Sequence, residues 1–292
     1  MKRKILITGA NGQLGYEINC ISKMYAKEND FFFANKKKLD ITNFEKINEY
    51  IVENKINIIV NCAAYTNVNK AEVEMKQADL INNKSVENLA LISKSHNIKL
   101  IHISTDYVYD GKTNKPYLET DKVSANSIYG KTKLDGESAF IRISPSNSII
   151  IRTSWLYSSH GNNFVKTMLD LGKKKSKLNV VSDQIGAPTY ARDLAKVILD
   201  IIPKLKNESV EVYNYSNEGA LSWYDFAKGI MEISNTNCKV DPIESKDYPL
   251  SEIRPYYSLL NKIKIKKTFN IEIPYYKDSL KKCLELLGDN KS

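Results

Sequence analysis

The beginning of the chain carries the feature that most restricts its fold, an apolar run that leads directly into regularly spaced glycines. Residues 4–8 read as a buried strand, and residues 13–25 have the apolar spacing of a helix. Between them, Gly9 permits a tight turn, Gly12 lets backbone approach a pyrophosphate, and Gly15 lets the helix pack closely on the strand. The N–H groups at the start of that helix then face the anion. We predict a dinucleotide site here; the alternative is an ordinary strand-turn-helix connection.

Hydroxyl and acidic residues follow a later apolar run that reads as another strand. Residues 100–103 end abruptly in Ser104, Thr105 and Asp106. A strand that stops at these residues and is followed by a loop and a helix presents them at the carboxyl edge of a sheet, where open α/β folds bind ligands. We therefore expect a ligand site at this edge.

Tyr129 and Lys133 form a candidate acid-base pair in a segment rich in helix formers, with Asn126 or Ser127 as the expected N-cap. On a helix the two side chains share one face, about one turn apart. A free tyrosine has a pKa of about 10, and an adjacent ammonium lowers that pKa towards the range useful for proton exchange. We expect the Thr105 hydroxyl to bond the same substrate oxygen. Because the chain has 18 tyrosines, this pair alone is weak evidence for an active site. The glycine turn at the start of the chain strengthens that interpretation.

Strands and helices alternate along the first half of the chain. The expected strands lie at residues 4–8, 31–34, 57–61, 100–103 and 148–151, and the expected helices at 13–25, 43–53, 73–95 and 131–137. This alternation predicts an α/β protein with a Rossmann-type, doubly wound parallel sheet. Residues 1–158 are the expected dinucleotide-binding domain, rejoined by about 190–216. Residues 159–292 mainly form a smaller C-terminal α/β substrate-binding domain.

The end of the second strand bears on the choice of cofactor. Asn35 stands where a dinucleotide fold usually places an acid that holds the adenosine ribose, and Lys36, Lys37 and Lys38 follow it. Without a repelling carboxylate and with positive charge nearby, a 2′-phosphate is tolerated. The sequence therefore favours NADPH and leaves NADH open, and a solvated lysine run is the alternative interpretation.

Charge and composition limit the partners. The 292 residues include 43 Lys and Arg against 34 Asp and Glu, a formal net charge of +9, but the lysines are scattered among acids. We therefore expect no nucleic-acid partner, although a basic surface attracts a phosphorylated small molecule. No segment approaches the roughly 20 apolar residues of a membrane span, so no membrane association is expected. Four widely spaced cysteines without a Cys-x-x-Cys pair fit a reducing compartment, and the expected location is cytoplasmic.

Motifs spread over nearly the whole chain resemble those of the dTDP-4-dehydrorhamnose reductase family, in the extended short-chain dehydrogenase/reductase superfamily. They lie at residues 9–15, 61–66, 104–109, 119–121, 129–133, 152–155, 161–164 and 183–189. The first and fifth are shared across the superfamily. The motifs at 152–155, 161–164 and 183–189 are much more specific to the family.

The resemblance implies hydride transfer from NADPH or NADH to the C4 carbonyl of dTDP-4-dehydro-β-L-rhamnose, which gives dTDP-L-rhamnose. In that reaction Tyr129 would donate the proton, Lys133 would hold the nicotinamide ribose, and Thr105 would orient the carbonyl oxygen. The expected cofactor contacts are Gly9, Gly12, Gln13, Leu14, Gly15, Asn35, Asp40, Ile41, Ala64, Tyr65, Thr66, Tyr129 and Lys133. The expected substrate contacts are Thr105, Asp106, Trp155 and Arg254, the last at the nucleotide diphosphate unless it is an ordinary surface arginine.

Some members of this family hold Mg²⁺ through glutamates at a subunit interface. Glu17 is present but no full set accompanies it, so we expect no metal, and we expect His102 to be a packed strand residue. The sequence leaves open whether the chain forms a homodimer. Two other functions remain: an NAD-dependent sugar-nucleotide epimerase or dehydratase, and a non-catalytic regulatory subunit resembling methionine adenosyltransferase β. The Trp155 segment disfavours the first, and the intact set of Thr105, Tyr129 and Lys133 disfavours the second.

Overall fold

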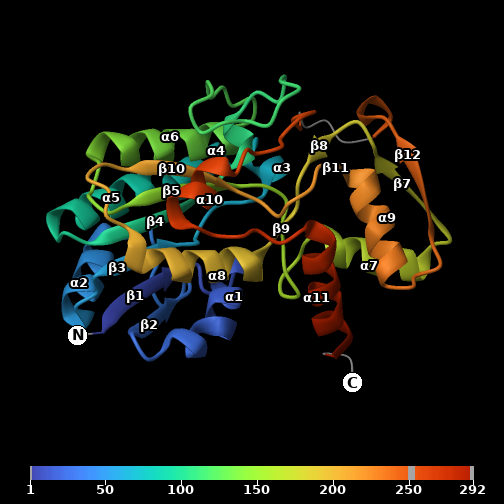
Figure 1. Ribbon diagram of the computed structural model, residues 1–292. Coiled ribbons are helices and arrows are strands. Elements are labelled where there is room, and N and C mark those ends of the chain that lie inside the picture. Colours follow the sequence, from blue (N-terminus) through green and yellow to red (C-terminus); the bar gives the residue numbers. More distant parts are fainter. Residues whose placement is uncertain (1, 249–253, 290–292) are drawn as a thin grey trace.

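A six-stranded parallel sheet forms the centre of the protein, whose computed structural model describes residues 2–248 and 254–289 (Figure 1). The strands follow the order β10-β5-β4-β3-β1-β2 and every pair is parallel. They are β1 (Arg3–Thr8), β2 (Asn29–Ala34), β3 (Ile58–Asn61), β4 (Lys99–Thr105), β5 (Ile149–Thr153) and β10 (Glu211–Tyr215). The strand order reverses between β1 and β3, the point where doubly wound sheets bind ligands. The predicted Rossmann-type α/β fold is confirmed.

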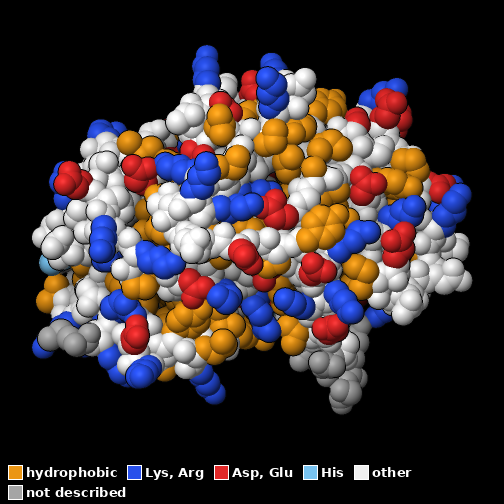
Figure 2. Space-filling view, viewed as in Figure 1, with side chains coloured by type: hydrophobic (Ala, Val, Ile, Leu, Met, Phe, Trp, Pro, Cys, Tyr) orange, Lys and Arg blue, Asp and Glu red, His pale blue; other side chains and the backbone are white. Residues whose placement is uncertain are grey.

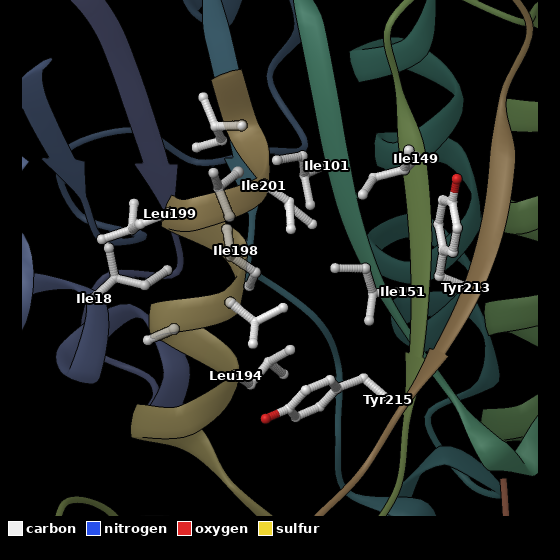
Figure 3. Packing of buried hydrophobic residues seen from close by; sticks show 14 of the residues in the cluster. Ile18, Ile101, Ile149, Ile151, Leu194, Ile198, Leu199, Ile201, Tyr213 and Tyr215 are labelled. Atoms are coloured by element: carbon white, nitrogen blue, oxygen red, sulfur yellow. The ribbon is translucent and has the colours of Figure 1, made fainter. Parts of the chain in front are cut away.

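Helices cover both faces of this sheet, which is why its strands are nearly continuous apolar runs. On one face lie α1 (Gln13–Ser22) and α8 (Ala191–Ile201), and on the other lie α2 (Phe44–Asn54), α5 (Ser85–Ser95) and α6 (Ile128–Ile143). Figure 3 shows the first interface, where Ile18 of α1 and Ile198 of α8 pack with strand residues such as Ile151. Apolar packing on both faces therefore holds the strands in position, including their carboxyl ends, where the sequence predicts a ligand site.

Residues 73–95 do not form the single helix that the sequence predicts. Instead the chain forms α3 (Val68–Ala71), α4 (Met75–Asp79), a π-helical turn η2 (Leu80–Lys84) and then α5. The wide turn points Asn82 inward, where its side chain accepts a hydrogen bond from Tyr65 N at 2.9 Å and donates to Tyr65 O at 3.0 Å. The interruption thus ties the helix to the loop after β3, a tertiary contact that helical periodicity does not reveal.

Apart from α8 and β10, most of the chain beyond β5 builds a smaller part from short strands, helices and packed aromatic rings (Figure 1). Its strands pair β6 with β9, β7 with β12 and β8 with β11. Its elements are β6 (Leu156–Tyr157), α7 (Phe164–Lys174), β7 (Lys177–Val181), β8 (Ile185–Gly186), β9 (Thr189–Tyr190), β11 (Leu221–Ser222), α9 (Trp223–Ile233), β12 (Lys239–Ile243) and α11 (Tyr276–Asp289). Ser222 caps α9 in a capping box with Asp225.

The remaining elements are short. They are η1 (Lys23–Tyr25), η3 (Asp106–Val108), η4 (Ile202–Lys204), η5 (Ser245–Asp247) and α10 (Ile263–Phe269). α10 returns to the main sheet, where the ring of Phe269 lies 5.0 Å from that of Tyr213 on β10. The last part of the chain therefore packs on both the sheet and the smaller part.

A buried ion pair joins the sheet to the helix that follows the β4 loop. Arg152 of β5 donates to Glu137 of α6 with an N–O distance of 2.6 Å, and the two side chains are 4% and 1% exposed. The same guanidinium donates to the hydroxyl of Tyr109 at 2.8 Å and lies over its ring. Together these contacts hold α6, β5 and the β4–α6 loop in one arrangement.

The surface mixes charges of both signs. On the face shown in Figure 2, Lys and Arg side chains are interspersed with Asp and Glu. Within residues 2–248 and 254–289, no helix combines the length and the apolar composition that crossing a membrane requires.

Candidate active site

A cavity of about 1150 Å³ opens at the carboxyl edge of the sheet. Its wall is formed by the residues that follow β1, β2, β3, β4 and β5, together with part of α6 and the turn before α7. The cavity therefore lies at the point where the strand order reverses, and most of the predicted site residues meet there.

The glycine turn fits a bound pyrophosphate. Gly9 has a φ of +64°, and a Cβ at this position would lie 2.7 Å from the backbone nitrogen of Ala63. Gly12, the N-cap of α1, has no side chain that could cap the helix, so the first N–H groups of α1 remain available to an anion. Gly12, Gln13 and Leu14 line the cavity.

Gly15 lies behind the turn and allows α1 to approach it. A Cβ there would lie 2.5 Å from the carbonyl oxygen of Gly9 and 2.7 Å from Cα of Ala10. We expect Gly15→Ala to open the turn at a cost of about 1–3 kcal/mol and to weaken NADPH binding tenfold or more. Fluorescence titration and a thermal denaturation midpoint measure both effects. Gly229→Ala in α9 is the matched control, because nothing lies within 4 Å of its Cβ, and unchanged NADPH affinity in Gly15→Ala would contradict the role of the turn.

Some of the residues after β2 line the cavity, and others stabilise the loop itself. The residues of this loop that line the cavity are Asn35, Lys36, Lys37, Leu39, Asp40 and Ile41. The Asn35 side chain also accepts from Lys38 N at 3.0 Å, and Lys38 Nζ donates to a backbone carbonyl at 3.2 Å. Two of the three lysines therefore face the expected adenosine end, while the third supports the loop.

The residues after β3 form a narrow wall of small side chains. Ala64 and Thr66 line the cavity, together with Cys62 at the start of the same stretch. The side chain of Tyr65 points elsewhere and donates to Glu74 at 2.7 Å. Asn82 holds the backbone of Tyr65, so Tyr65 helps to position the neighbouring wall residues although it does not line the cavity itself.

Tyr129, Lys133 and Thr105 are brought together on one wall of the cavity. α6 begins at Ile128 because Ser127 caps it, its Oγ accepting from Gly130 N at 3.1 Å. This start places Tyr129 in the first turn and Lys133 one turn later, as the sequence predicts. The hydroxyl of Thr105 at the end of β4 hydrogen-bonds to the phenol of Tyr129.

The pKa of Tyr129 differs from the sequence expectation. Burial raises the pKa of Tyr129 to about 12, the hydrogen bond to Thr105 lowers it, and the charge of Asp106 raises it. The expected lowering by Lys133 was therefore wrong for this arrangement, since Lys133 Nζ donates instead to the carbonyl of Ile103 at 2.7 Å. Burial also lowers the pKa of Lys133 to about 8, opposed by the charge of Glu137.

Trp155, a predicted substrate contact, forms part of the cavity wall. It lines the cavity and adopts a φ of +47°, an uncommon conformation for a bulky residue. Its ring stacks on Trp223 of α9 with centroids 3.6 Å apart. A Cβ on Gly186 would lie 2.8 Å from the Trp155 ring, so the ring is enclosed from two sides.

Two predicted substrate residues lie off this wall. Among the described residues that line the cavity, neither Asp106 nor Arg254 is included. Asp106 is buried behind Thr105, whose Oγ1 donates to it at 3.1 Å, and burial raises the pKa of Asp106 to about 6. Arg254 is half-buried beside Pro255, which packs on Gly111, and the residue before it lies outside the described ranges.

Several wall residues were missed by the sequence reasoning. They include Thr153, Ser154, Leu156, Gly161 and Asn162. The Asn163 side chain donates to Gln13 Oε1 at 2.9 Å, which joins the turn before α7 to the glycine turn. The motif at 161–164 was noticed as a family signature, and this contact gives it a physical role.

Glu17 is buried in α1 and its charge is already compensated. Ser158 Oγ donates to one carboxylate oxygen at 2.6 Å, and Arg192 Nε donates to the other at 2.7 Å. Across the part of the chain that the structure describes, no group of three or more His, Cys, Asp or Glu side chains is placed to hold a metal ion.

The strand reversal, the open helix N-terminus and the Tyr129–Lys133 pair above it are features of NAD(P)-dependent reductases of the extended short-chain dehydrogenase/reductase type. Family comparison is more specific. The sequence model described as the RmlD substrate binding domain matches residues 3–288, and the chain belongs to this family.

Relatives and solved structures agree with this assignment. A dTDP-4-dehydrorhamnose reductase of Aggregatibacter actinomycetemcomitans is 39% identical over 289 residues, which covers 95% of this chain and 97% of that protein. A crystal structure of such a reductase from Clostridium acetobutylicum is 41% identical with a TM-score of 0.92, covering 98% and 99% of the two chains. One from Bacillus anthracis, in complex with NADP, is 37% identical with a TM-score of 0.92, covering 98% and 100%. The predicted resemblance is confirmed, and a nicotinamide dinucleotide cofactor agrees with that complex.

Proposed function

We propose that this protein reduces the C4 carbonyl of dTDP-4-dehydro-β-L-rhamnose with NADPH or NADH and thereby forms dTDP-L-rhamnose. The observation that carries the proposal is the convergence of Tyr129, Lys133 and Thr105 on the wall of the dinucleotide cavity. A carbonyl that accepts a hydride also needs a proton on its oxygen, and this set supplies a donor and its support.

The cofactor, when bound, supplies the hydride. Gly9, Gly12, Gln13, Leu14 and Gly15 form the pyrophosphate turn. The adenosine end would meet Asn35, Asp40 and Ile41, and the middle of the cofactor would lie along Ala64, Tyr65 and Thr66. The ammonium of Lys133 holds the nicotinamide ribose.

Proton delivery belongs to Tyr129. Because burial raises its pKa to about 12, the phenol keeps its proton at neutral pH and can donate it to the alkoxide oxygen that develops at C4. Thr105 orients the carbonyl oxygen with its one hydroxyl proton, which must turn from Asp106 to the substrate for this bond.

The substrate lies towards the smaller part of the protein. Trp155 packs on the sugar, Asp106 fixes the hydroxyl of Thr105 from behind, and Arg254 binds the nucleotide diphosphate. Residues 1–158, with about 190–216, act as the dinucleotide-binding domain, and residues 159–292 mainly as the substrate-binding domain.

The decisive experiment follows the loss of reduced-cofactor absorbance with dTDP-4-dehydro-6-deoxy sugars, with and without the epimerase that supplies the L-configured substrate. Stoichiometric oxidation of NADPH or NADH, dependent on the sugar nucleotide, is the expected result. Tightly bound NAD⁺ with turnover in the absence of added reduced cofactor would indicate an epimerase or dehydratase. No turnover, together with co-purification of a synthetase subunit, would indicate a regulatory protein.

Cofactor preference should depend on the two lysines that face the cavity. We expect the double variant Lys36→Ala/Lys37→Ala to lose about tenfold or more in kcat/KM for NADPH and little for NADH, because only the former has a 2′-phosphate to pair with them. Lys38→Ala is the matched control, since that side chain supports the loop. Equal losses with both cofactors would contradict this role.

A further inference from the structure

A row of four buried polar side chains runs beneath the cavity from β1 to α6. Thr8, Asn61 and His102 come from three neighbouring strands, Lys133 comes from the helix, and each is at most 1% exposed. Thr8 Oγ1 lies 2.6 Å from the Asn61 side-chain oxygen, the Asn61 amide nitrogen 3.0 Å from His102 Nδ1, and His102 Nε2 3.2 Å from Lys133 Nζ. The row ends at a residue of the proposed proton-transfer set.

Hydrogen-bond roles along this row follow from its lysine end. An ammonium can only donate, so His102 Nε2 must accept and cannot carry a proton. A neutral imidazole then has its proton on Nδ1, and it must donate towards Asn61. The two ends of an Asn amide have the same shape, so the amide oxygen turns to His102 and the NH₂ group donates to Thr8 Oγ1. One tautomer and one amide orientation satisfy the whole row.

The surroundings of His102 also exclude its doubly protonated, charged form. Burial, followed by the charge of Lys133, lowers the pKa of His102 well below its ordinary value. A second cation 3.2 Å from the ammonium, in a buried site, would be strongly unfavourable. His102 is therefore a neutral acceptor over the whole pH range in which the enzyme would act.

We propose that His102 is a positioning residue, which as the Nδ1–H tautomer holds the Lys133 side chain in its charged form and aims it at the cavity. Its catalytic consequence rests on the proposed function. Lys133 also donates to the Ile103 carbonyl on β4 and feels the charge of Glu137 on α6, which is already paired with Arg152. Without His102, the Ile103 carbonyl would be the hydrogen-bond acceptor left to the ammonium among the described residues.

The first test reads the tautomer directly and needs no activity. The chain has three histidines, so ¹⁵N-histidine NMR of the full-length protein resolves them, and His102→Gln identifies the signals of His102. The expected pattern is a protonated Nδ1 and an unprotonated Nε2 that do not titrate between about pH 5.5 and 8.5. A proton on Nε2, or a titration within that range, would overturn the proposal.

The second test uses variants that separate the two ring nitrogens. A glutamine side chain can place an acceptor near the position of Nε2, whereas an asparagine reaches only the position of Nδ1. In His102→Asn we expect the alkaline limb of the kcat/KM profile, set by Lys133, to move down by about one pH unit, because a hydrogen bond from a charged donor is lost. In His102→Gln we expect the limb to stay in place.

The outcomes separate the two proposals. Equal profiles for the Asn and Gln variants would show that His102 only fills space and would overturn its positioning role. If the wild-type protein reduces none of the sugar nucleotides, the proposed function fails, while the NMR pattern still decides the tautomer. If both variants fail to fold, His96→Gln and His160→Gln assign the other two histidines, so the remaining signals belong to His102 and the wild-type NMR pattern still decides the tautomer.

Discussion

Replacing Tyr129 with phenylalanine is expected to lower kcat by about 10²–10⁴-fold, the contribution typical of a positioned proton donor. The change removes one oxygen atom and keeps the ring, which packs edge-on against Tyr107 with centroids 5.4 Å apart. NADPH binding should therefore stay within about twofold. Steady-state kinetics with saturating NADPH and a fluorescence titration of the cofactor measure the two quantities separately.

Tyr25→Phe is the matched control for the loss of a phenol. Its hydroxyl donates to Asp200 at 2.7 Å, neither residue lines the cavity, and burial raises its pKa as it does for Tyr129. The control should lose about 1 kcal/mol of stability and no turnover. If Tyr129→Phe retained wild-type turnover, the proton would have to come from another group or from water, and the mechanism proposed for this cavity would be wrong.

The parts of the site that were predictable from sequence are those in which local chemistry decides the geometry. Gly9 is favoured by its φ of +64°, Gly15 is required by close contacts with Gly9 and Ala10 in the same strand-turn-helix unit, and Ser127 determines where α6 begins. Once that start is known, the helical repeat places Tyr129 and Lys133 on one face. Both statements need only residues that are near each other in the chain.

The other parts depend on partners that are distant in sequence. The direction of the Lys133 ammonium is set by His102 and Ile103 on β4, and so the expected effect on the pKa of Tyr129 failed. Two-residue strands such as β6 and β9 exist only because they pair with each other, and they carry no periodicity of their own. Side-chain directions, as for Tyr65, follow the same rule.

Arg152 shows that a single sequence also does not reveal which distant contacts stabilise the fold. The motif at 152–155 was read as a family signature next to the substrate, but its arginine lies 4% exposed against Glu137 rather than in the cavity wall. A buried guanidinium requires a buried carboxylate from another element, and a single sequence does not reveal which acid that is. Its main contribution is therefore to how α6 is held, and through α6 to the position of Tyr129.

We expect Arg152→Met to destabilise the fold by about 3–5 kcal/mol, because it leaves the Glu137 carboxylate buried without its partner. Arg142→Met is the matched control, because Arg142 also lies on α6 and pairs with Glu87 at 2.7 Å. The Arg142 side chain is 66% exposed, so the loss of this ion pair should cost about 0–1 kcal/mol. Urea denaturation midpoints followed by circular dichroism compare the two variants directly.

A second substitution separates the value of the pair from the cost of breaking it. Adding Glu137→Leu to Arg152→Met removes the stranded charge, so the double variant should recover much of the lost stability even though the ion pair is gone. If the double variant were as unstable as the sum of the two single variants, the coupling energy between the two side chains would be zero, and the explanation by a stranded Glu137 charge would be wrong. If Arg152→Met were as stable as Arg142→Met, Glu137 would have to reach water or another donor, and α6 would not be held as the structure places it.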